Sequence, residues 1–440
     1  MHSEEDEHLP SEIVLVTVSG EDKPGLMAML TSTLASYQAQ VLDIGQAVIH
    51  EELALGLLVR IPSQDDVALI QQALAALATE VGSNVRFTKV SKARYRDWAN
   101  SSGEPRYIIT LLTRGHASEA LHAVSTITHR HGLNIDTVRR LSGRVPLANT
   151  VTDEKICLEL RVRASRAHRG VSGAPEKLNA ELMEASAELA FDFSVHEDDV
   201  FRRNRRLVAF DMDSTLIDAE VMDELAARHG VGEAVSAITA RAMCGELDFQ
   251  TSFRARAELL KGMPVEILED VAECVELNEG ADRLIRALRH FGYRTAIISG
   301  GFQYVGERLQ NRLGIDYVFA NELVVENGRM TGEVAGEIVD AERKAELLKN
   351  IADSEGMLLE QTIAIGDGAN DLPMLSAAGL GVAYHAKPLV KQTANHSISN
   401  FGLDSVLYLM GFSDRDIEQA LRVPFSRPGP GDQPSSVLKS

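Results

Sequence analysis

The chain has 440 residues, of which 45% are apolar, and a formal net charge of −20 at pH 7. Its length predicts roughly two to four domains. Nucleic acid and anionic membranes are not expected partners, because binding their phosphates needs clustered Lys and Arg. Three distant cysteines without a CxxC motif favour a reducing cytoplasm over a disulfide framework or a zinc site. No apolar leader and no run of about 18 uncharged apolar residues occurs, so neither export nor a membrane span is expected.

The first predicted elements form an internal repeat. After an acidic segment (1–11) that we expect to be disordered, "EIVLVTVSGEDKPGLMAMLTSTLASYQAQVLDIGQAVI" reads as strand, turn, helix and strand, and "RYIITLLTRGHASEALHAVSTITHRHGLNIDTVRRLSG" repeats this order. Each continues into a further apolar strand and a helix. The repeat predicts two ferredoxin-like (α+β) units with a βαββαβ order, at 12–99 and 105–196. Polar linkers are expected at "NSSGEPR" and at "HEDDVFRRNRR".

The turn "GEDKPGLMAML" of the first unit opens a helix with Pro24 and Gly25, whose neighbouring amide groups could face a carboxylate. The same residues are also a good turn without any ligand. With the repeat, this stretch resembles ACT domains, which are small amino-acid-sensing modules. The resemblance implies an effector site near Asp22 and Gly25. The second unit lacks both the Asp and the Pro of this turn, so we treat it as degenerate.

The third segment, 205–412, predicts a doubly wound α/β domain. Short apolar runs ending in polar residues or Gly, "LVAFDMD", "YRTAIISGG", "QTIAIGDGAND" and "LGVAYHA", are typical of buried parallel strands. The Asn327-Gly328 turn indicates a β-hairpin. The long stretch between the first two of these strands exceeds one crossover helix, so we expect a helical cap at about 219–277 that closes over the site. The tail 425–440 is expected to be disordered.

Four polar stretches coincide with predicted strand ends or a following helix: "DMDST" (Asp211 to Thr215), "SGG" (Ser299 to Gly301), Lys344, and "GDGAND" (Gly366 to Asp371). Together they offer the parts that phosphoryl transfer needs. Asp211 can act as the nucleophile, and Asp213 as the general acid and then base. A divalent cation held by Asp211, the Asp213 backbone carbonyl and Asp367 would relieve their repulsion. Oxygen-only ligands favour Mg²⁺.

Each stretch alone has a structural interpretation. A lone DxD can be a turn at a strand end, Ser299 a turn hydroxyl, and Lys344 a solvated charge on a helix. Gly368 and Asn370 can equally be turn formers. Their order along the chain nevertheless resembles the haloacid-dehalogenase superfamily of phosphotransferases, whose motifs DxDx[TV], Ser or Thr, Lys, and GDxxxD are all matched. This resemblance implies a HAD-like fold and places Asp371 behind the metal ligands.

A closer resemblance extends from about 207 to 411. "MDSTLIDAEVMDELA", "AMCGELDFQTSFRARAELLKGMP" and "ISGGFQYVGERLQNRLGIDYVFANELVVENGRMTGEV" are similar to the phosphoserine phosphatase family. The resemblance implies that Glu220 holds the substrate ammonium and Arg256 its carboxylate. It implies that Met243 and Phe249 shield the site. The further residues expected to bind substrate are Ser299, Gly300 and Asn370.

The expected activity is therefore hydrolysis of O-phospho-L-serine to L-serine, with Mg²⁺ as cofactor, as the last step of L-serine biosynthesis. A related phosphatase or phosphotransferase acting on another small phospho-amino acid is the alternative enzyme. From another class, the chain could be an ACT-based sensor with an inert phosphatase domain. We expect a homodimer formed through the ACT units, because open sheet edges favour pairing. L-serine is the expected effector.

Overall fold

The computed structural model describes residues 11–100, 106–115, 117–144, 155–164, 175–394 and 396–422. The two segments expected to be disordered lie outside these residues, apart from Ser11. The chain divides into two compact units, residues 1–104 and 105–440. Among the described helices, none combines the length and the apolar character needed to cross a membrane.

The smaller unit has the predicted βαββαβ order. Its elements are β1 (Glu12–Glu21), α1 (Leu26–Ser36), β2 (Gln40–Ile49), β3 (Glu52–Ile61), α2 (Gln64–Glu80) and β4 (Asn84–Val90). The strands form an antiparallel sheet in the order β2-β3-β1-β4. Leu26, Leu30 and Leu34 of α1 bury the helix against this sheet. A further helix, α3 (Lys92–Ala99), precedes residue 100 and was not predicted.

The larger unit begins with a second copy of the same arrangement. Its elements are β5 (Arg106–Arg114), α4 (Ala117–Arg130), β6 (Leu133–Arg140), β7 (Lys155–Ala164), α5 (Pro175–Leu189) and β8 (Asp192–Glu197). The strand order β8-β5-β7-β6 corresponds to β4-β1-β3-β2 of the smaller unit. We call residues 106–197 the second ACT-like unit.

A doubly wound α/β domain follows. Its strands are β9 (Leu207–Phe210), β10 (Arg294–Phe302), β11 (Tyr317–Glu326), β12 (Arg329–Ala335), β13 (Thr362–Gly366), β14 (Leu380–Tyr384) and β15 (His396–Ile398). The strands β11, β10, β9, β13, β14 and β15 are parallel, and β12 closes the hairpin with β11. Its helices outside the cap are α10 (Ala281–His290), α11 (Gln303–Leu313), α12 (Ala341–Ser354), α13 (Leu372–Ala377), α14 (Pro388–Thr393), α15 (Val406–Leu409) and α16 (Asp414–Arg422).

Alternating residues of β9 face two cores, as expected for a sheet covered on both faces. Val208 and Phe210 pack with residues of α10 and α11, whereas Leu207 and Ala209 pack with residues of α12 and α13. The long stretch between β9 and β10 forms the helical cap, with α6 (Val221–His229), α7 (Gly232–Met243), α8 (Phe249–Leu259) and α9 (Val265–Cys274). The fold class predicted from the sequence is therefore confirmed.

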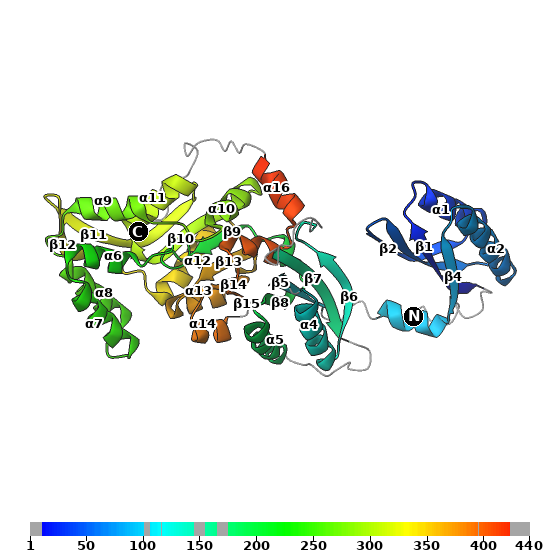
Figure 1. The fold of residues 1–440 in the computed structure, drawn as a ribbon, viewed down its shortest axis with the longest axis horizontal. Helices are drawn as coiled ribbons and strands as arrows, with labels where there is room; N and C mark the ends of the chain where they lie inside the picture. The colour runs from blue at the N-terminus through cyan, green and yellow to red at the C-terminus, as the bar shows by residue number, and fades with distance from the viewer. Residues whose placement is uncertain are drawn as a thin grey trace. The chain divides into compact units, whose positions relative to one another are not determined.

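The structure adds one feature to this prediction, because the second ACT-like unit and the α/β domain share one sheet. The shared sheet has 11 strands in the order β12-β11-β10-β9-β13-β14-β15-β8-β5-β7-β6 (Figure 1). Antiparallel pairing of β15 with β8, at His396–Ser194 and Ser397–Phe193, makes the connection. Asn400 reinforces it, since its backbone N–H and its Nδ2 donate to the Asp192 carboxylate at 2.8 and 2.9 Å.

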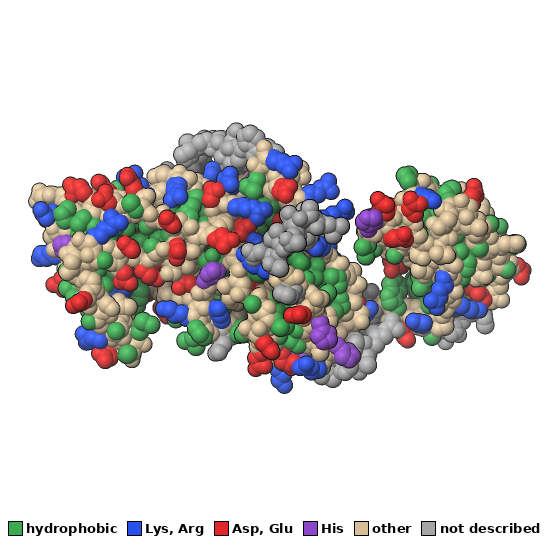
Figure 2. All heavy atoms as spheres, in the orientation of Figure 1, with side chains coloured by type: hydrophobic (Ala, Val, Ile, Leu, Met, Phe, Trp, Pro, Cys, Tyr) green, Lys and Arg blue, Asp and Glu red, His purple; other side chains and the backbone are tan. Residues whose placement is uncertain are grey.

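The segment predicted as a polar linker, 196–206, is anchored by two buried arginines, although Val200 within it is 78% exposed. Arg202 is 3% exposed, and its Nη2 donates to Oε2 of the buried Glu159 on β7 at 2.5 Å. Arg205 is buried to the same extent. Elsewhere on the face shown in Figure 2, acidic and basic side chains of the larger unit are intermixed. On this face, the negative net charge is therefore distributed rather than gathered at one place.

Candidate active site

The site starts where β9 ends. Asp211 follows Phe210 directly, and its backbone N–H donates to the Ile365 carbonyl of β13 at 2.9 Å. Its Oδ1 accepts the Met212 N–H at 2.7 Å, and the residue is 5% exposed. The carboxyl ends of β9, β10 and β13 meet here, which is where open α/β sheets bind ligands. Asp211 is thus a nearly buried carboxylate in a fixed orientation, with its second oxygen left for other partners.

Lys344 supplies a positive charge to this carboxylate. It lies in the first turns of α12, whose N-terminus is capped by the Asp340 side chain accepting from the Arg343 N–H. Lys344 is fully buried, and its Nζ lies 2.9 Å from Asp211 Oδ2 and 2.7 Å from Asp371 Oδ1. Burial alone would lower the pKa of Lys344, but the two carboxylates raise it above its ordinary value. The side chain is therefore a permanent cation beneath the site.

Three carboxylates form the candidate metal site. Ligand atoms of Asp211, Asp367 and Asp371 all lie within 4.8 Å of one another. Burial and the Asp211 charge raise the pKa of Asp367 to about 6 and that of Asp371 to about 7. Asp371 accepts from Lys344 and from the Gly368 N–H, whereas Asp367 accepts only a long hydrogen bond of 3.5 Å from Thr215 Oγ1 among the described residues. A hard divalent cation fits this oxygen-only set, because it would relieve the mutual repulsion.

Asp213 occupies a different environment from Asp211. Its Oδ1 is buried and has no hydrogen-bond partner among the described residues. Burial, with the Asp211 and Glu220 charges, raises its pKa well above the ordinary value. A side chain at Gly301 would approach within 2.8 Å of Asp213 Oδ2, so this position has room only for glycine. Asp213 therefore favours the protonated form, as a proton donor should.

The irregular last residues of β10, Ser299–Gly301, complete the floor. Ser299 is 1% exposed, and its Oγ accepts the Gly301 N–H at 3.0 Å. Asn321 of β11, which belongs to none of the sequence motifs, donates from Nδ2 to the Gly300 carbonyl at 2.8 Å and accepts the Val339 N–H at 2.9 Å. The only signal in the sequence is a polar residue inside the apolar run "YVFANELVV". Asn321 therefore fixes the position of the Ser299–Gly301 segment of β10.

These groups border one cavity of about 600 Å³ between the sheet and the cap. Most of the residues predicted from the sequence line it: Asp211, Asp213, Glu220, Met243, Phe249, Arg256, Ser299, Gly300, Asp367 and Asn370. Lys344 and Asp371 lie beneath the lining. Lys387, which precedes α14, and Leu389 of α14 also line the cavity, although no sequence pattern predicted them.

The cap contributes an arginine and two apolar side chains to the cavity. Arg256 of α8 is partly buried, and its Nε is buried without a hydrogen-bond partner in the described structure. Arg254, two residues earlier, is exposed and lines a different depression on the surface. Phe249 stacks on Phe253 with ring centroids 6.0 Å apart. Met243 is 72% exposed, so in this structure it lies at the mouth of the cavity.

Glu220 is the N-cap residue of α6 and lies at the exposed side of the cavity. Its Oε1 accepts from the Ser214 Oγ at 2.8 Å. Ser214 itself has a left-handed backbone with φ of 55°, which turns the chain sharply after Asp213. The opposite charges of Glu220 and Arg256 therefore border the same cavity as Asp211.

Comparisons with known proteins agree with this site. Residues 208–376 match the haloacid dehalogenase-like hydrolases, and residues 12–88 match the ACT domain. The phosphoserine phosphatase SerB2 of Mycobacterium tuberculosis is 38% identical over 414 residues, covering 94% of this chain and 96% of the relative. The phosphoserine phosphatase of Streptomyces coelicolor is 37% identical over 409 residues, covering 92% and 94%.

The chain belongs to the phosphoserine phosphatase family. Solved structures support the same assignment. A HAD family hydrolase from Salmonella enterica serovar Typhi aligns with a TM-score of 0.58 at 31% identity, over 69% of this chain and 98% of that one. A probable phosphoserine phosphatase from Vibrio cholerae aligns with a TM-score of 0.54 at 32% identity, over 71% and 88%. Phosphoserine phosphatases are HAD-type hydrolases, so the prediction of an enzyme with this fold and an ACT domain is confirmed.

Proposed function

We propose that the protein hydrolyses O-phospho-L-serine to L-serine and phosphate through a phosphorylated Asp211, as the last step of L-serine biosynthesis. The observation that carries this proposal is the Asp211 carboxylate held 2.9 Å from the buried Lys344 Nζ, at the base of a cavity that Glu220 and Arg256 also line. A nucleophile, a cation beside it, and one anion and one cation for a zwitterion are thus combined in one site.

In the first step, an Asp211 oxygen attacks phosphorus and the bond from phosphorus to the serine oxygen breaks. Asp213, whose raised pKa favours the protonated form, gives its proton to the departing alkoxide. In the second step, Asp213 takes a proton from water, the water oxygen attacks phosphorus, and the Asp211 carboxylate leaves. Lys344 stabilises the charge on Asp211 throughout, which makes the carboxylate a better leaving group.

Asp211, Asp367 and the Asp213 backbone carbonyl would hold Mg²⁺, with Asp371 behind them. When bound, this ion neutralises negative charge on the phosphate and the carboxylates. Glu220 binds the substrate ammonium and Arg256 the carboxylate, while Ser299, Gly300 and Asn370 contact the phosphate end. Met243 and Phe249 shield the site from water. Unpaired Arg256 Nε supports this assignment, since a buried donor without a partner favours a ligand that supplies one.

Phosphate release from a panel of phosphoamino acids tests the function. O-phospho-L-serine is expected to be the best substrate, with activity lost on chelation of divalent ions and restored by Mg²⁺. A panel with no turnover at all would favour an inert sensor, and a preference for another phospho-amino acid would assign the chain to a related phosphatase.

We also propose that the ACT units regulate the enzyme and assemble it as a homodimer in the cytoplasm. β2 is an edge strand of the smaller sheet, and apolar side chains on it are exposed, with Ile44 at 50% and Val48 at 45%. Open apolar edges favour pairing with a second copy. Sedimentation of the full chain tests the dimer.

L-serine is the proposed effector, bound near the start of α1. Gly25 is the N-cap residue of α1 with φ of 90°, and Asp22 is exposed beside it. We expect calorimetric titration of the full chain to show L-serine binding that persists in Arg256→Met, where binding of product to the active site is weakened. Asp22→Ala in that background should remove the remaining binding because it deletes the anion for the ammonium group. Asp97→Ala, at an exposed position of the same unit, is the control. Unchanged binding in the Asp22 variant would place any effector elsewhere.

A further inference from the structure

The two chain segments that join the cap to the sheet lie side by side immediately after the catalytic loop, Asp211–Thr215. Ile217 and Leu277 form an isolated antiparallel bridge. The Asp218 N–H donates to the Glu276 carbonyl at 3.0 Å. The hinge of the cap is therefore a paired crossing, and its first strand is continuous with the loop that carries Asp211 and Asp213.

Asn278 clamps this crossing. Its Nδ2 donates to the carbonyls of Thr215 at 2.9 Å and of Ile217 at 3.1 Å, and its backbone N–H donates to the Leu216 carbonyl at 3.0 Å. Asn278 is not among the residues that line the active-site cavity. It can therefore influence the catalytic loop only by fixing the backbone.

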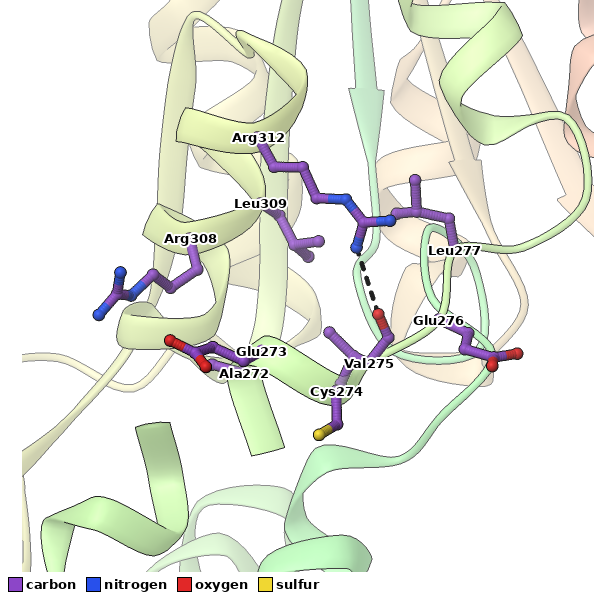
Figure 3. Close-up of a pocket in the computed structure, with 9 residues that line it drawn as sticks. All are labelled: Ala272, Glu273, Cys274, Val275, Glu276, Leu277, Arg308, Leu309 and Arg312. Carbon is purple, nitrogen blue, oxygen red and sulfur yellow. Dashed lines mark hydrogen bonds between the residues drawn. The ribbon is translucent and has the colours of Figure 1, made fainter. Parts of the chain in front are cut away.

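The second of the two segments that join the cap to the sheet, residues 275–277, also contacts α11. Arg312 donates from Nη1 to the Val275 carbonyl at 3.3 Å, beside a cavity of about 640 Å³ that residues 272–277 line together with α11 (Figure 3). This segment therefore has contacts on two sides before the chain reaches Asn278. The next residues, Glu279 and Gly280, contact a part of the chain that does not line the active-site cavity.

Residues 402–404 pack tightly on Glu279 and Gly280. The Leu403 N–H donates to the Glu279 carbonyl at 2.6 Å. A side chain at Gly280, which has φ of 81°, would come within 2.5 Å of Asp404 Oδ1. Asp404 is 6% exposed, and Arg283 of α10 donates to its Oδ2 at 2.5 Å. The Asp404 carboxylate is therefore in contact with the backbone two residues after Asn278.

The second ACT-like unit supplies the other partner of this carboxylate. Lys155, the first residue of β7, lies with its Nζ 3.4 Å from Asp404 Oδ1 and 3.3 Å from Ser405 Oγ. The ammonium also lies over the rings of Phe401 and Tyr408, at 5.6 and 5.4 Å from their centroids. A continuous series of contacts therefore runs from Lys155 through Asp404 and Gly280 to Asn278 and the catalytic loop.

We propose that Asn278 is a positioning residue for the catalytic loop and that Lys155 of the second ACT-like unit helps to set its position through Asp404. The kinetic part of this inference rests on the proposed phosphoserine hydrolysis. The quantity to measure is the energetic coupling between Asn278 and Lys155.

A double-mutant cycle provides that measurement. Asn278→Asp keeps the shape of the side chain but sets a carboxylate against two carbonyls. We expect kcat to fall by about 10²-fold with KM changed by less than about twofold, because small misplacements of reacting groups are costly while substrate contacts remain. Lys155→Met keeps the apolar stem and should lower kcat by about threefold to tenfold. Lys155→Arg should retain activity, and Lys177→Met, at an exposed position of α5, is the matched control.

If the residues are coupled, the double variant should lose at least about threefold less activity than the product of the two single losses. Losses that simply multiply would overturn the proposal.

Hydrogen exchange gives a readout that needs no substrate. The Thr215, Leu216 and Ile217 amides all donate to the Met212 carbonyl, so they should be protected in the wild type. Lys155→Met and Asp404→Asn are expected to speed exchange at these amides, while strand β5 stays protected and Lys177→Met changes nothing. Unchanged exchange in both variants would overturn the inference, even if Asn278→Asp failed to fold. Absence of phosphoserine turnover in the wild type would instead refute the proposed function and leave the exchange comparison decisive.

Discussion

Asp211→Asn is expected to abolish turnover while the protein remains folded. The amide has nearly the same shape as the carboxylate, but it is not a nucleophile toward phosphorus. The expected loss is at least about 10⁵-fold, close to the limit of detection, since covalent catalysis has no substitute in the site. Phosphate release measures the loss of turnover. Acid-quenched labelling with O-phospho-L-serine that carries a radioactive phosphate measures the covalent intermediate, and the variant should carry no label.

Asp218→Asn is the matched control, because the Asp218 side chain is exposed and lies just after the catalytic loop. It should keep wild-type activity. Asp213→Asn should slow both phosphorylation and hydrolysis by about 10² to 10⁴-fold, as loss of general acid-base help usually does. A folded Asp211→Asn protein with near-normal turnover would refute the covalent mechanism.

Discrimination between substrates is the second large effect. Phosphoethanolamine lacks the carboxylate of phosphoserine and glycolate phosphate lacks the ammonium, so each leaves Arg256 or Glu220 without its partner. A site with buried polar groups rejects such analogues by about 10⁴-fold in kcat/KM. Glu220 is exposed in this structure, so the larger discrimination is expected for phosphoethanolamine, which deprives the partly buried Arg256.

Arg256→Met assigns this discrimination to one side chain. The variant should lose most of its kcat/KM for phosphoserine but little for phosphoethanolamine, so that the two substrates become nearly equal. Arg254→Met is the matched control, since Arg254 lies two residues away on the same helix and outside the cavity. Equal efficiencies for all three substrates in the wild type would indicate a general phosphatase.

The placement of the motif residues was predictable because it follows from local rules. Asp211, Ser299 and Asp367 each follow an apolar run, and parallel strands bring their carboxyl ends to one edge of a sheet. The helix-capping Asp340 and the hairpin turn at Asn327 are likewise local signals. The choice of Arg256 over Arg254 came from family resemblance alone, and the two cavities that they line are consistent with it.

Contacts between distant segments could not be predicted in the same way. Asn321 and Asn278 act through hydrogen bonds to backbone groups of segments distant in the sequence, and no periodicity marks such residues. The segment containing Arg202 and Arg205 looked like a solvated linker because eight of the eleven residues in "HEDDVFRRNRR" are Asp, Glu, Arg or His. Only the tertiary partner Glu159 explains why Arg202 is buried. No local sequence pattern predicts the pairing of β8 with β15 either.

That pairing has a consequence for how the chain folds. The Asp192 carboxylate can form its hydrogen bonds with Asn400 only after a further 208 residues have been synthesised. During synthesis, β8 therefore remains an open edge until almost the whole α/β domain has been made. Contacts of such long sequence separation slow folding, and unpaired edges promote aggregation in the meantime. The nascent chain is thus most exposed to aggregation between completion of β8 and emergence of β15.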